Sequence, residues 1–417
     1  MAPRILRPLL AFALAAASAC AEQPTDPGAG HFARGGNPGS NAAPLTATPT
    51  SLALVLPSSA SGIVTARVQF VGSISATTSD AACATVSPLS LPATKPTGSS
   101  VYVASFTVTG EAPGSCTITL TDKRGGTATV QVQVREAPPV DGTRLVFTSN
   151  REGNNELYTS NGDGSGLVRL TETSANEQDP AFFPDRSKIV YASDETGTWN
   201  LFMAGADGSG RVQLTSYDLG DGFGAVSPAV SPDGQQVAFV LFPGFGGGNQ
   251  VHIHVMDAAA GATPVAITAG NTQDGSPAYA PDGRIVFSSV AFDPGPPVTS
   301  GLPSLWIMYA NGASLTQLTS PSGTGDGNPA VSPDGTTIAF VRGGGIALMP
   351  IGGGEPEYVV TGTSNGAPVF SPDGAWLAFL RIQSTDSEIM ALKLGEPAES
   401  AVNVTGNAAS DGPPDWR

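Results

Sequence analysis

A phrase of about thirteen residues recurs through the second half of the chain and restricts its fold more than any other feature. One copy, NPAVSPDGTTIAF, occupies 328–340. Further copies at 179–191, 227–239, 276–287 and 367–379 read DPAFFPDRSKIVY, SPAVSPDGQQVAF, SPAYAPDGRIVF and APVFSPDGAWLAF, and a truncated PPDW occupies 413–416. We call the first aligned proline of each copy its marker proline, and the six are Pro180, Pro228, Pro277, Pro329, Pro368 and Pro414. They lie 48, 49, 52, 39 and 46 residues apart. Spacings of this size are typical of propeller blades or solenoid units.

The chemistry of the phrase predicts an edge strand, a tight turn and a buried strand. Proline has no N–H for a ladder hydrogen bond, so a strand that it opens lies at a sheet edge. Pro-Asp-Gly then favours a turn. The apolar triplets that follow, IVY, VAF, IVF, IAF and LAF, lack polar alternation, which indicates burial on both faces.

Each repeat supplies two more predicted strands. The third strand is apolar, as in LYTS (157–160) and LWIM (305–308), and the fourth ends on threonine, as in VRLT (168–171) and TQLT (316–319). RLVF at 144–147 adds a sixth second strand, which the final PPDW would complete. We therefore predict an all-β fold with a six-bladed propeller over 143–417, closed by the C-terminal strand.

This phrase, followed by an aliphatic strand, a DG turn and a closing LT, resembles the TolB-type propeller repeat over about 275 residues. The resemblance implies a propeller fold and a habit of binding partners. TolB itself carries an α/β domain before its propeller, and this chain has a different sequence there, so the resemblance does not transfer TolB's partners.

The N-terminus has the features of an export signal. Residues 1–19 combine Arg4 and Arg7 with an apolar stretch and then small residues up to Cys20. The ending ASAC resembles a lipobox and predicts lipidation of Cys20. Ordinary cleavage at the same place, leaving a free thiol, stays open. Residues 20–44 are rich in Pro, Gly, Asn and Ala and predict a flexible tether.

Residues 45–136 predict a separate β-sandwich. Short, largely alternating segments such as IVTARVQFVG (63–72) and TATVQVQV (127–134) are separated by turn signals. The stretch GSCTITLTDKRGGTATVQVQV resembles the last hairpin of a bacterial immunoglobulin-like domain. If Cys20 is lipidated, Cys83 and Cys116 remain as a disulfide pair. Residues 137–142 form a linker.

Charge is divided unevenly between the two predicted domains. The sandwich has five Lys and Arg against four Asp and Glu, whereas the propeller has eleven against 28, a net charge of −17. Such acidity argues against nucleic acid and anionic lipid as propeller partners. It suits cations, basic peptides or neutral glycans. No stretch after the signal approaches the ~20 apolar residues of a membrane span.

Two sets of residues are candidate binding sites. Three residues before the marker prolines lie polar side chains that a ring would place around the channel mouth: Glu177, Asp274, Asp326, Asn365 and Asp411. They could hold Ca²⁺ or the basic end of a peptide, or each could cap its own turn. Long loops supply aromatic residues that could form one exposed patch or pack under their own loops: Tyr217, Phe223, Phe242, Phe245 and Phe292.

Catalytic signals are few. Ser364 lies in a G-x-S-x-G match, GTSNG, but between predicted strands rather than on a strand–turn–helix elbow, so we predict a loop serine. His252 and His254 share one strand face and are weak metal candidates. The repeat alignment instead places His254 in an aromatic packing slot. The Asp-Gly segments at 161–166 and 205–210 are predicted hairpin turns.

Together these features predict an exported, lipid-anchored envelope protein. Its propeller is expected to bind a protein, peptide or glycan without catalysis and without a cofactor, and the chain is expected to be monomeric. A glycan hydrolase or lyase that uses the channel mouth is the alternative.

Overall fold

The computed structural model describes residues 44–56, 61–139, 142–219, 223–244, 250–291, 301–320 and 323–417. Within these ranges the protein is all-β, and the one helical element is a 3-10 turn, η1 (Ala398–Ser400). None of the helical structure in this part of the chain is long and apolar enough to cross a membrane. The chain forms two compact units with a boundary between Val134 and Arg135. The predicted signal sequence and nearly all of the tether, with Cys20, lie outside the described residues.

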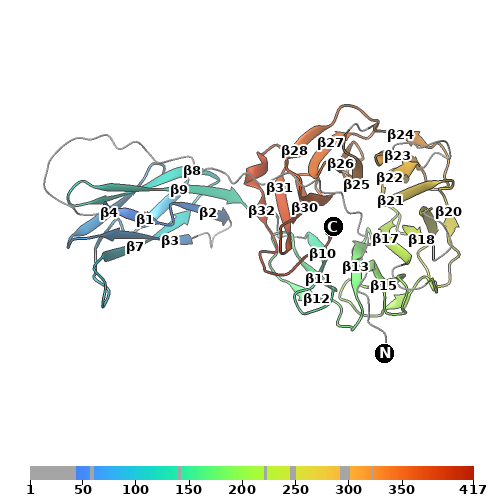
Figure 1. Cartoon of the computed structure of the whole chain (residues 1–417), viewed down its shortest axis with the longest axis horizontal. Coiled ribbons are helices and arrows are strands. Elements are labelled where there is room, and N and C mark those ends of the chain that lie inside the picture. Colours follow the sequence, from blue (N-terminus) through green and yellow to red (C-terminus); the bar gives the residue numbers. More distant parts are fainter. Residues whose placement is uncertain are drawn as a thin grey trace. The chain divides into compact units, whose positions relative to one another are not determined.

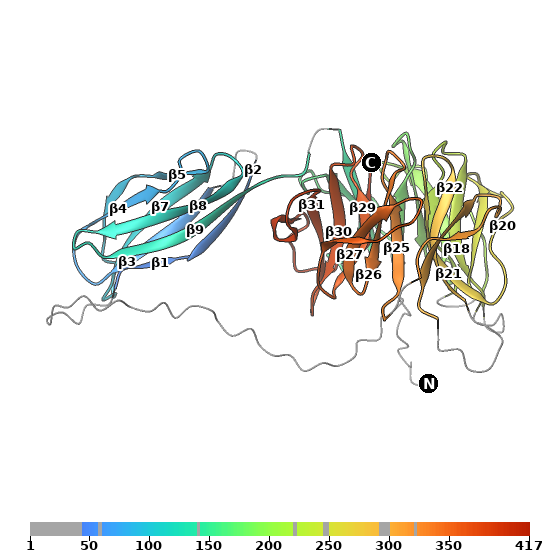
Figure 2. The ribbon, with the colours of Figure 1, turned by 90° about the horizontal axis from the view of Figure 1, so that it is seen from above.

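The first unit contains two antiparallel sheets (Figure 2). One has the order β1 (Thr46–Thr48), β3 (Ser61–Val68), β7 (Tyr102–Gly110) and β5 (Ala84–Ser87). The other has the order β2 (Ser51–Leu56), β9 (Thr127–Glu136), β8 (Gly114–Asp122), β4 (Ser73–Thr78) and β6 (Ser90–Pro92). Alternate residues of the longer strands are buried, among them Val64 and Ala66 on β3 and Ile118 and Leu120 on β8. This period of two gives each sheet one apolar face.

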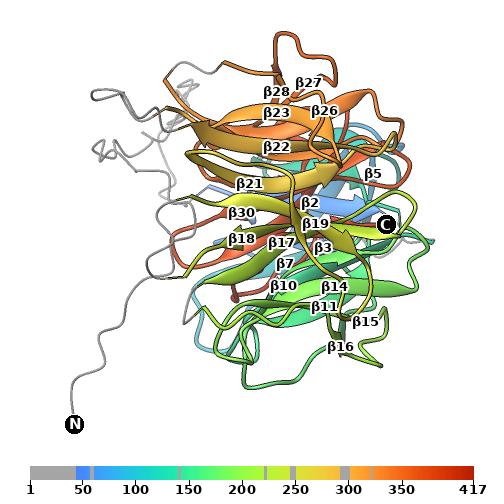
Figure 3. The ribbon, with the colours of Figure 1, turned by 90° about the vertical axis from the view of Figure 1, so that its right-hand side faces the viewer.

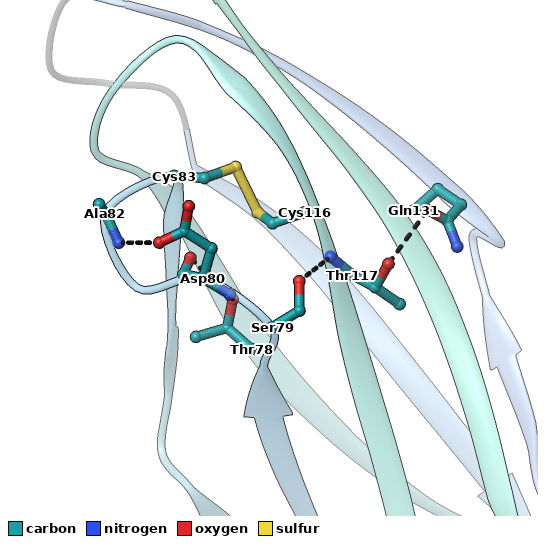
Figure 4. Close-up of a disulfide and its surroundings, with 8 residues drawn as sticks. All are labelled: Thr78, Ser79, Asp80, Ala82, Cys83, Cys116, Thr117 and Gln131. Atoms are coloured by element: carbon teal, nitrogen blue, oxygen red, sulfur yellow. Dashed lines mark hydrogen bonds between the residues drawn. A yellow bond between two sulfur atoms is a disulfide. The ribbon is translucent and has the colours of Figure 1, made fainter.

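A disulfide joins Cys83 to Cys116, the pair expected from the sequence, with their Cα atoms 6.2 Å apart (Figure 4). Both cysteines are buried. The loop that precedes Cys83 is also held by hydrogen bonds: Ala82 N donates to Asp80 Oδ1 over 2.9 Å, and Thr117 N donates to Ser79 Oγ over 2.9 Å. The bridge closes a separation of 33 residues, a loop for which chain entropy gives roughly 3–4 kcal/mol of stabilisation.

The second unit contains six four-stranded sheets, numbered here in chain order (Figure 1). Sheet 1 consists of β33 (Asp415–Trp416), β10 (Arg144–Ser149), β11 (Glu156–Asn161) and β12 (Val168–Arg169); sheet 2 of β13 (Glu177–Phe182), β14 (Lys188–Ser193), β15 (Asn200–Gly205) and β16 (Val212–Gln213); sheet 3 of β17 (Gly224–Val230), β18 (Gln236–Phe242), β19 (His252–Asp257) and β20 (Val265–Ala266). Sheet 4 consists of β21 (Thr272–Tyr279), β22 (Arg284–Ala291), β23 (Ser304–Tyr309) and β24 (Thr316–Gln317); sheet 5 of β25 (Asp326–Val331), β26 (Thr337–Arg342), β27 (Gly345–Pro350) and β28 (Glu357–Val360); sheet 6 of β29 (Asn365–Phe370), β30 (Trp376–Ile382), β31 (Ser387–Lys393) and β32 (Val402–Asn403).

The sheets are arranged in a ring with the first strand of each sheet innermost (Figure 1). Neighbouring sheets lie side by side, as the contacts of β21 and β22 with β25 show; Figure 3 labels β21–β23 of sheet 4 and β26–β28 of sheet 5. The apolar triplets of the second strands are buried between sheets, and their aromatic residues are among the most buried of the described side chains: Tyr191, Phe239, Phe287, Phe340 and Phe379. Burial on both faces explains why these triplets show no polar alternation.

In sheets 2 to 6 the marker proline lies in the middle of its strand rather than at its start, whereas Pro414 directly precedes β33. In sheet 2, Asp179 and Pro180 together oppose the single residue Tyr191, which is a β-bulge. The same two-against-one register occurs in the first strands of sheets 3, 4, 5 and 6. The innermost strand is a sheet edge, so the missing N–H of the proline leaves no ladder partner unpaired.

The threonine that closes most repeats has a definite structural role. Leu157 N, at the start of the third strand of sheet 1, donates to Thr171 Oγ1 over 2.8 Å. Equivalent bonds of 2.9–3.0 Å reach Thr215, Thr268, Thr319 and Thr405. The hydroxyl therefore continues the hydrogen bonding of a fourth strand that has only two residues. Sheet 5 departs from this pattern, because its fourth strand extends to Val360 and pairs through the backbone.

The C-terminal residues pair with the first strand of the unit. Trp416 lies opposite Leu145 and Asp415 opposite Val146, so β33 becomes the innermost strand of sheet 1. Arg144 and Arg417 exchange two backbone hydrogen bonds of 2.6 and 2.9 Å. The Trp416 side chain is 1% exposed and packs in one cluster with residues of β10 and β30. The chain's last residues thus join sheet 1 to sheet 6.

Candidate functional site

Six equivalent residue pairs occupy the beginning of the innermost strands. Each joins the residue three positions before the marker proline to its partner on the second strand. The pairs are Glu177–Ser193, Ala225–Leu241, Asp274–Ser289, Asp326–Arg342, Asn365–Arg381 and Asp411–Ser149. We call them the junction pairs, because the connections between successive sheets end there.

The acidic ring predicted at the channel mouth does not form an exposed group in the part of the chain that the structure describes. All five of its residues are buried, with exposures from 0 to 8%, and each is bonded within its own junction. Asp274, for example, accepts hydrogen bonds from Ser289 Oγ at 2.6 Å and Thr272 Oγ1 at 3.0 Å. Among the described residues no group of three or more His, Cys, Asp and Glu side chains could hold a metal ion.

The strand boundaries explain this difference. In sheets 2 to 6 the innermost strand begins at or before the junction-pair residue, so that residue belongs to the sheet. In sheet 1, Asp411 precedes β33 and pairs with Ser149 through an isolated bridge. The carboxylates bond to serine, threonine and arginine of the junction rather than only capping a DG or NG turn. Asp411 illustrates this, with Arg151 Nη2 at 3.1 Å and Asn407 Nδ2 at 3.0 Å.

Two carboxyl groups of sheets 1 and 2 interact directly. Burial, together with a hydrogen bond and the charge of Glu156, raises the pKa of Glu177 to about 7. Burial alone would raise the pKa of Glu156 as well, but hydrogen bonds from Thr171 and Thr173 lower it. Arg169 Nη2 lies 3.0 Å from Glu156 Oε1 and stabilises the anion. The pair therefore consists of an ionised Glu156 and a Glu177 that holds its proton up to neutral pH.

A different set of residues lies at the bulges of the innermost strands. In sheets 2 to 6 the residue immediately before the marker proline is in the bulge and has a left-handed φ of 44–51°, which is costly for residues other than glycine. We call these residues the axial set: Asp179, Ser227, Ser276, Asn328 and Ala367. All five are at least partly exposed, and the innermost strands that carry them face one another around the ring centre (Figure 1).

Hydrogen bonds link members of the axial set between sheets. Asp179 Oδ2 accepts from both N and Oγ of Ser227, each over 3.1 Å, and Asn328 Nδ2 donates to Ser276 Oγ over 3.3 Å. Burial raises the pKa of Asp179, and the two bonds from Ser227 oppose that effect. This set was not among the residues predicted from the sequence, although four of its members are polar residues that directly precede aligned prolines.

The two histidines do not form a metal site with other described residues. The His254 ring stacks on Phe239, its cross-strand neighbour in sheet 3, with a centroid distance of 5.6 Å. This confirms the aromatic packing role, within one sheet rather than between two. Burial lowers the pKa of His254. His252 Nδ1 lies 3.4 Å from Asp274 Oδ2.

The described loop aromatics do not form an exposed patch. Tyr217 and Phe242 pack against the buried cluster of sheets 2 and 3, and Phe223 is only partly exposed. Phe245 and Phe292 lie outside the described residues. Tyr217 therefore packs beneath its own loop, whereas Phe242 is the last residue of β18 and packs from the strand.

The remaining sequence motifs are structural. Ser364 is an exposed loop residue, and the next residue begins the strand β29 rather than a helix. In the two Asp-Gly segments, Asp163 and Asp207 each accept hydrogen bonds from N and Oγ of the serine two residues later. Both segments form the turns that the sequence predicted.

A ring of four-stranded antiparallel sheets with their first strands around one axis defines a β-propeller. Residues 220–417 match the family model described as TolB beta propeller domain. Residues 220–417 therefore match a TolB-type β-propeller domain, and the resemblance inferred from the repeated phrase is confirmed over these residues.

Known TolB proteins are also similar to this chain in sequence and in structure. A TolB homolog of Chlorobium chlorochromatii is 29% identical over 202 residues, which are 48% of this chain and 32% of that protein. The match therefore spans about a third of the relative's own length. TolB from Acinetobacter baumannii has a TM-score of 0.54 at 19% identity, covering 73% of this chain and 80% of that one. A chain of Kuenenia stuttgartiensis hydrazine synthase has a TM-score of 0.56 at 17% identity, covering 67% and 47%. At these identities the two solved structures show only that this chain has the same fold as they do.

Proposed function

We propose that this protein is an exported component of the bacterial envelope whose propeller binds a segment of a protein partner without catalysis. In this proposal Cys20 is lipidated and anchors the chain. Residues 45–136 form an immunoglobulin-like spacer, and the six sheets act as the blades of one binding domain. The axial set is the contact surface.

The axial set is the observation that supports a binding role. A left-handed φ costs a residue with a side chain about 1–2 kcal/mol, and four polar residues adopt it here. Glycine would satisfy the backbone at each of these positions without strain. Strained residues concentrate at functional sites, where the surrounding structure holds them in place. The bulges place partly exposed hydroxyl, amide and carboxylate groups on the innermost strands, where they can bond to the backbone of an inserted peptide segment.

Glycine substitution provides a clean test, because it removes the side chains and keeps the backbone conformation. We expect the variant Asp179→Gly, Ser227→Gly, Ser276→Gly and Asn328→Gly to remain folded. Its capture of protein from an envelope fraction should fall at least about tenfold, the loss of some 1.4 kcal/mol of binding. Capture is measured by quantitative mass spectrometry with immobilised protein beginning at Pro44.

A matched control also introduces four glycines, but in the turns between third and fourth strands. The residues replaced there are Asp163, Ser165, Asp207 and Ser209. This control should capture the same proteins as the unmodified chain. Equal capture by the axial variant and the control would refute the axial site.

A further inference from the structure

Sheets 5 and 6 contain two arginines at equivalent positions with different partners. In sheet 5, Arg342 Nε and Nη2 lie 2.6 and 2.7 Å from the two carboxylate oxygens of Asp326. In sheet 6, the residue opposite Arg381 is Asn365, and the Arg381 Nε to Asn365 Oδ1 distance is 3.5 Å. The neutral amide of Asn365 thus occupies the position at which the preceding repeat has the Asp326 carboxylate. The Arg381 guanidinium therefore has N–H donors left for another acceptor.

The carboxylate opposite Arg381 on the neighbouring strand is already occupied. Glu388 is the cross-strand neighbour of Arg381 on β31, and it is 2% exposed. Its oxygens accept from Thr405 Oγ1 at 2.6 Å and from Asn407 N at 2.9 Å. Within the described residues no Asp or Glu oxygen lies within 4 Å of the Arg381 guanidinium, and burial lowers the pKa of Arg381.

Arg381 also lines a surface pocket of about 510 Å³. The walls combine polar side chains such as Thr361, Ser364 and Asn403 with the apolar Met390 and Ile382, and Ile382 is 53% exposed. Arginine binds carboxylates through two parallel N–H donors, as Arg342 does in this chain, and this geometry is lost with lysine.

We propose that Arg381 and Asn365 form a binding site for a carboxylate of a peptide partner. The described lining contains no aromatic residue, whereas aromatic rings are the groups that stack on the faces of sugar rings. The apolar Met390 and Ile382 beside the cation instead suit an Asp or Glu flanked by apolar residues. The site goes beyond the proposed axial contact and is built from different residues, so either can fail alone.

Resin-bound mixed hexapeptides test the site, one pool with Asp fixed at a central position and a matched pool with Asn there. At 0.1 M salt we expect the full-length protein to be retained at least tenfold more strongly by the Asp pool. Arg381→Gln should abolish that preference. Asn365→Asp should abolish it too, because the new carboxylate would pair with Arg381 as Asp326 pairs with Arg342. This variant should fold, since the neighbouring repeat carries Asp326 at the equivalent position.

The neighbouring junction supplies a second check. Asp326→Asn recreates the sheet 6 arrangement at Arg342 and should increase retention by the Asp pool. Tyr309→Ser, an exposed change on the outer part of sheet 4, should leave retention unchanged.

Equal retention by the two pools, or unchanged preference in Arg381→Gln, would overturn the site. Displacement of the protein by a uronic acid oligosaccharide at lower concentration than by free Asp peptide would overturn the peptide as its ligand. The axial glycine variant should keep the Asp preference.

Discussion

Removal of residues 413–417 should destabilise the propeller by more than about 5 kcal/mol. The deletion eliminates the fully buried Trp416 and leaves β10 as an unpaired sheet edge. It also removes Asp415, whose Oδ2 accepts a 2.7 Å hydrogen bond from Phe182 N in sheet 2. Tryptophan fluorescence during urea unfolding measures the effect, because all four tryptophans of the chain belong to the propeller and the three that remain report on it alone.

Two point variants separate side-chain packing from strand pairing. Trp416→Ala should cost about 3–5 kcal/mol. Trp416→Phe should cost only about 1–2 kcal/mol, because Phe182 and Phe370 fill the equivalent positions in sheets 2 and 6 and Trp416 Nε1 has no hydrogen-bond partner among the described residues. A truncated protein that unfolds at the same urea concentration as the full chain would show that β33 does not hold sheets 1 and 6 together.

Glu177→Gln should change how the stability of the propeller depends on pH. The pKa of Glu177 rises from an ordinary 4.5 to about 7 in the folded state. Between these values the folded protein keeps a proton that the unfolded chain releases, so this group makes stability fall as pH rises. Above pH 7 it is ionised in both states, and the cost reaches about 3 kcal/mol. The neutral amide avoids the cost, so the variant's advantage should grow by that amount from about pH 4.5 to about pH 8.

Urea unfolding at several pH values, again followed by tryptophan fluorescence, gives the difference curve. Glu172→Gln is a suitable control, because the Glu172 side chain is 87% exposed and its replacement should shift the curve by no more than a few tenths of a kcal/mol. Parallel curves for Glu177→Gln and the unmodified protein would contradict a raised pKa of Glu177 in the folded protein.

Much of the propeller follows from local sequence. An edge strand, a turn and a doubly buried strand can be read from one copy of the repeated phrase, because proline chemistry, Asp-Gly turns and unbroken apolar triplets act over a few residues. The fourth strands were predicted too long. Their threonines look like strand residues but contribute a side-chain hydroxyl, as Thr171 does for Leu157.

The positions of the site residues depended on tertiary structure. Strand alternation alone cannot say where a bulge inserts an extra residue, and each bulge changes which side chains face the axis beyond it. In sheet 2 the acidic residue chosen from the sequence, Glu177, is therefore buried at a junction, while Asp179, two positions later in the bulge, is partly exposed. Whether a junction arginine is paired likewise depends on a partner sixteen residues away, as Asp326 and Asn365 show. The repeat determined the ring, and packing between sheets decided which of its polar groups stay available to a partner.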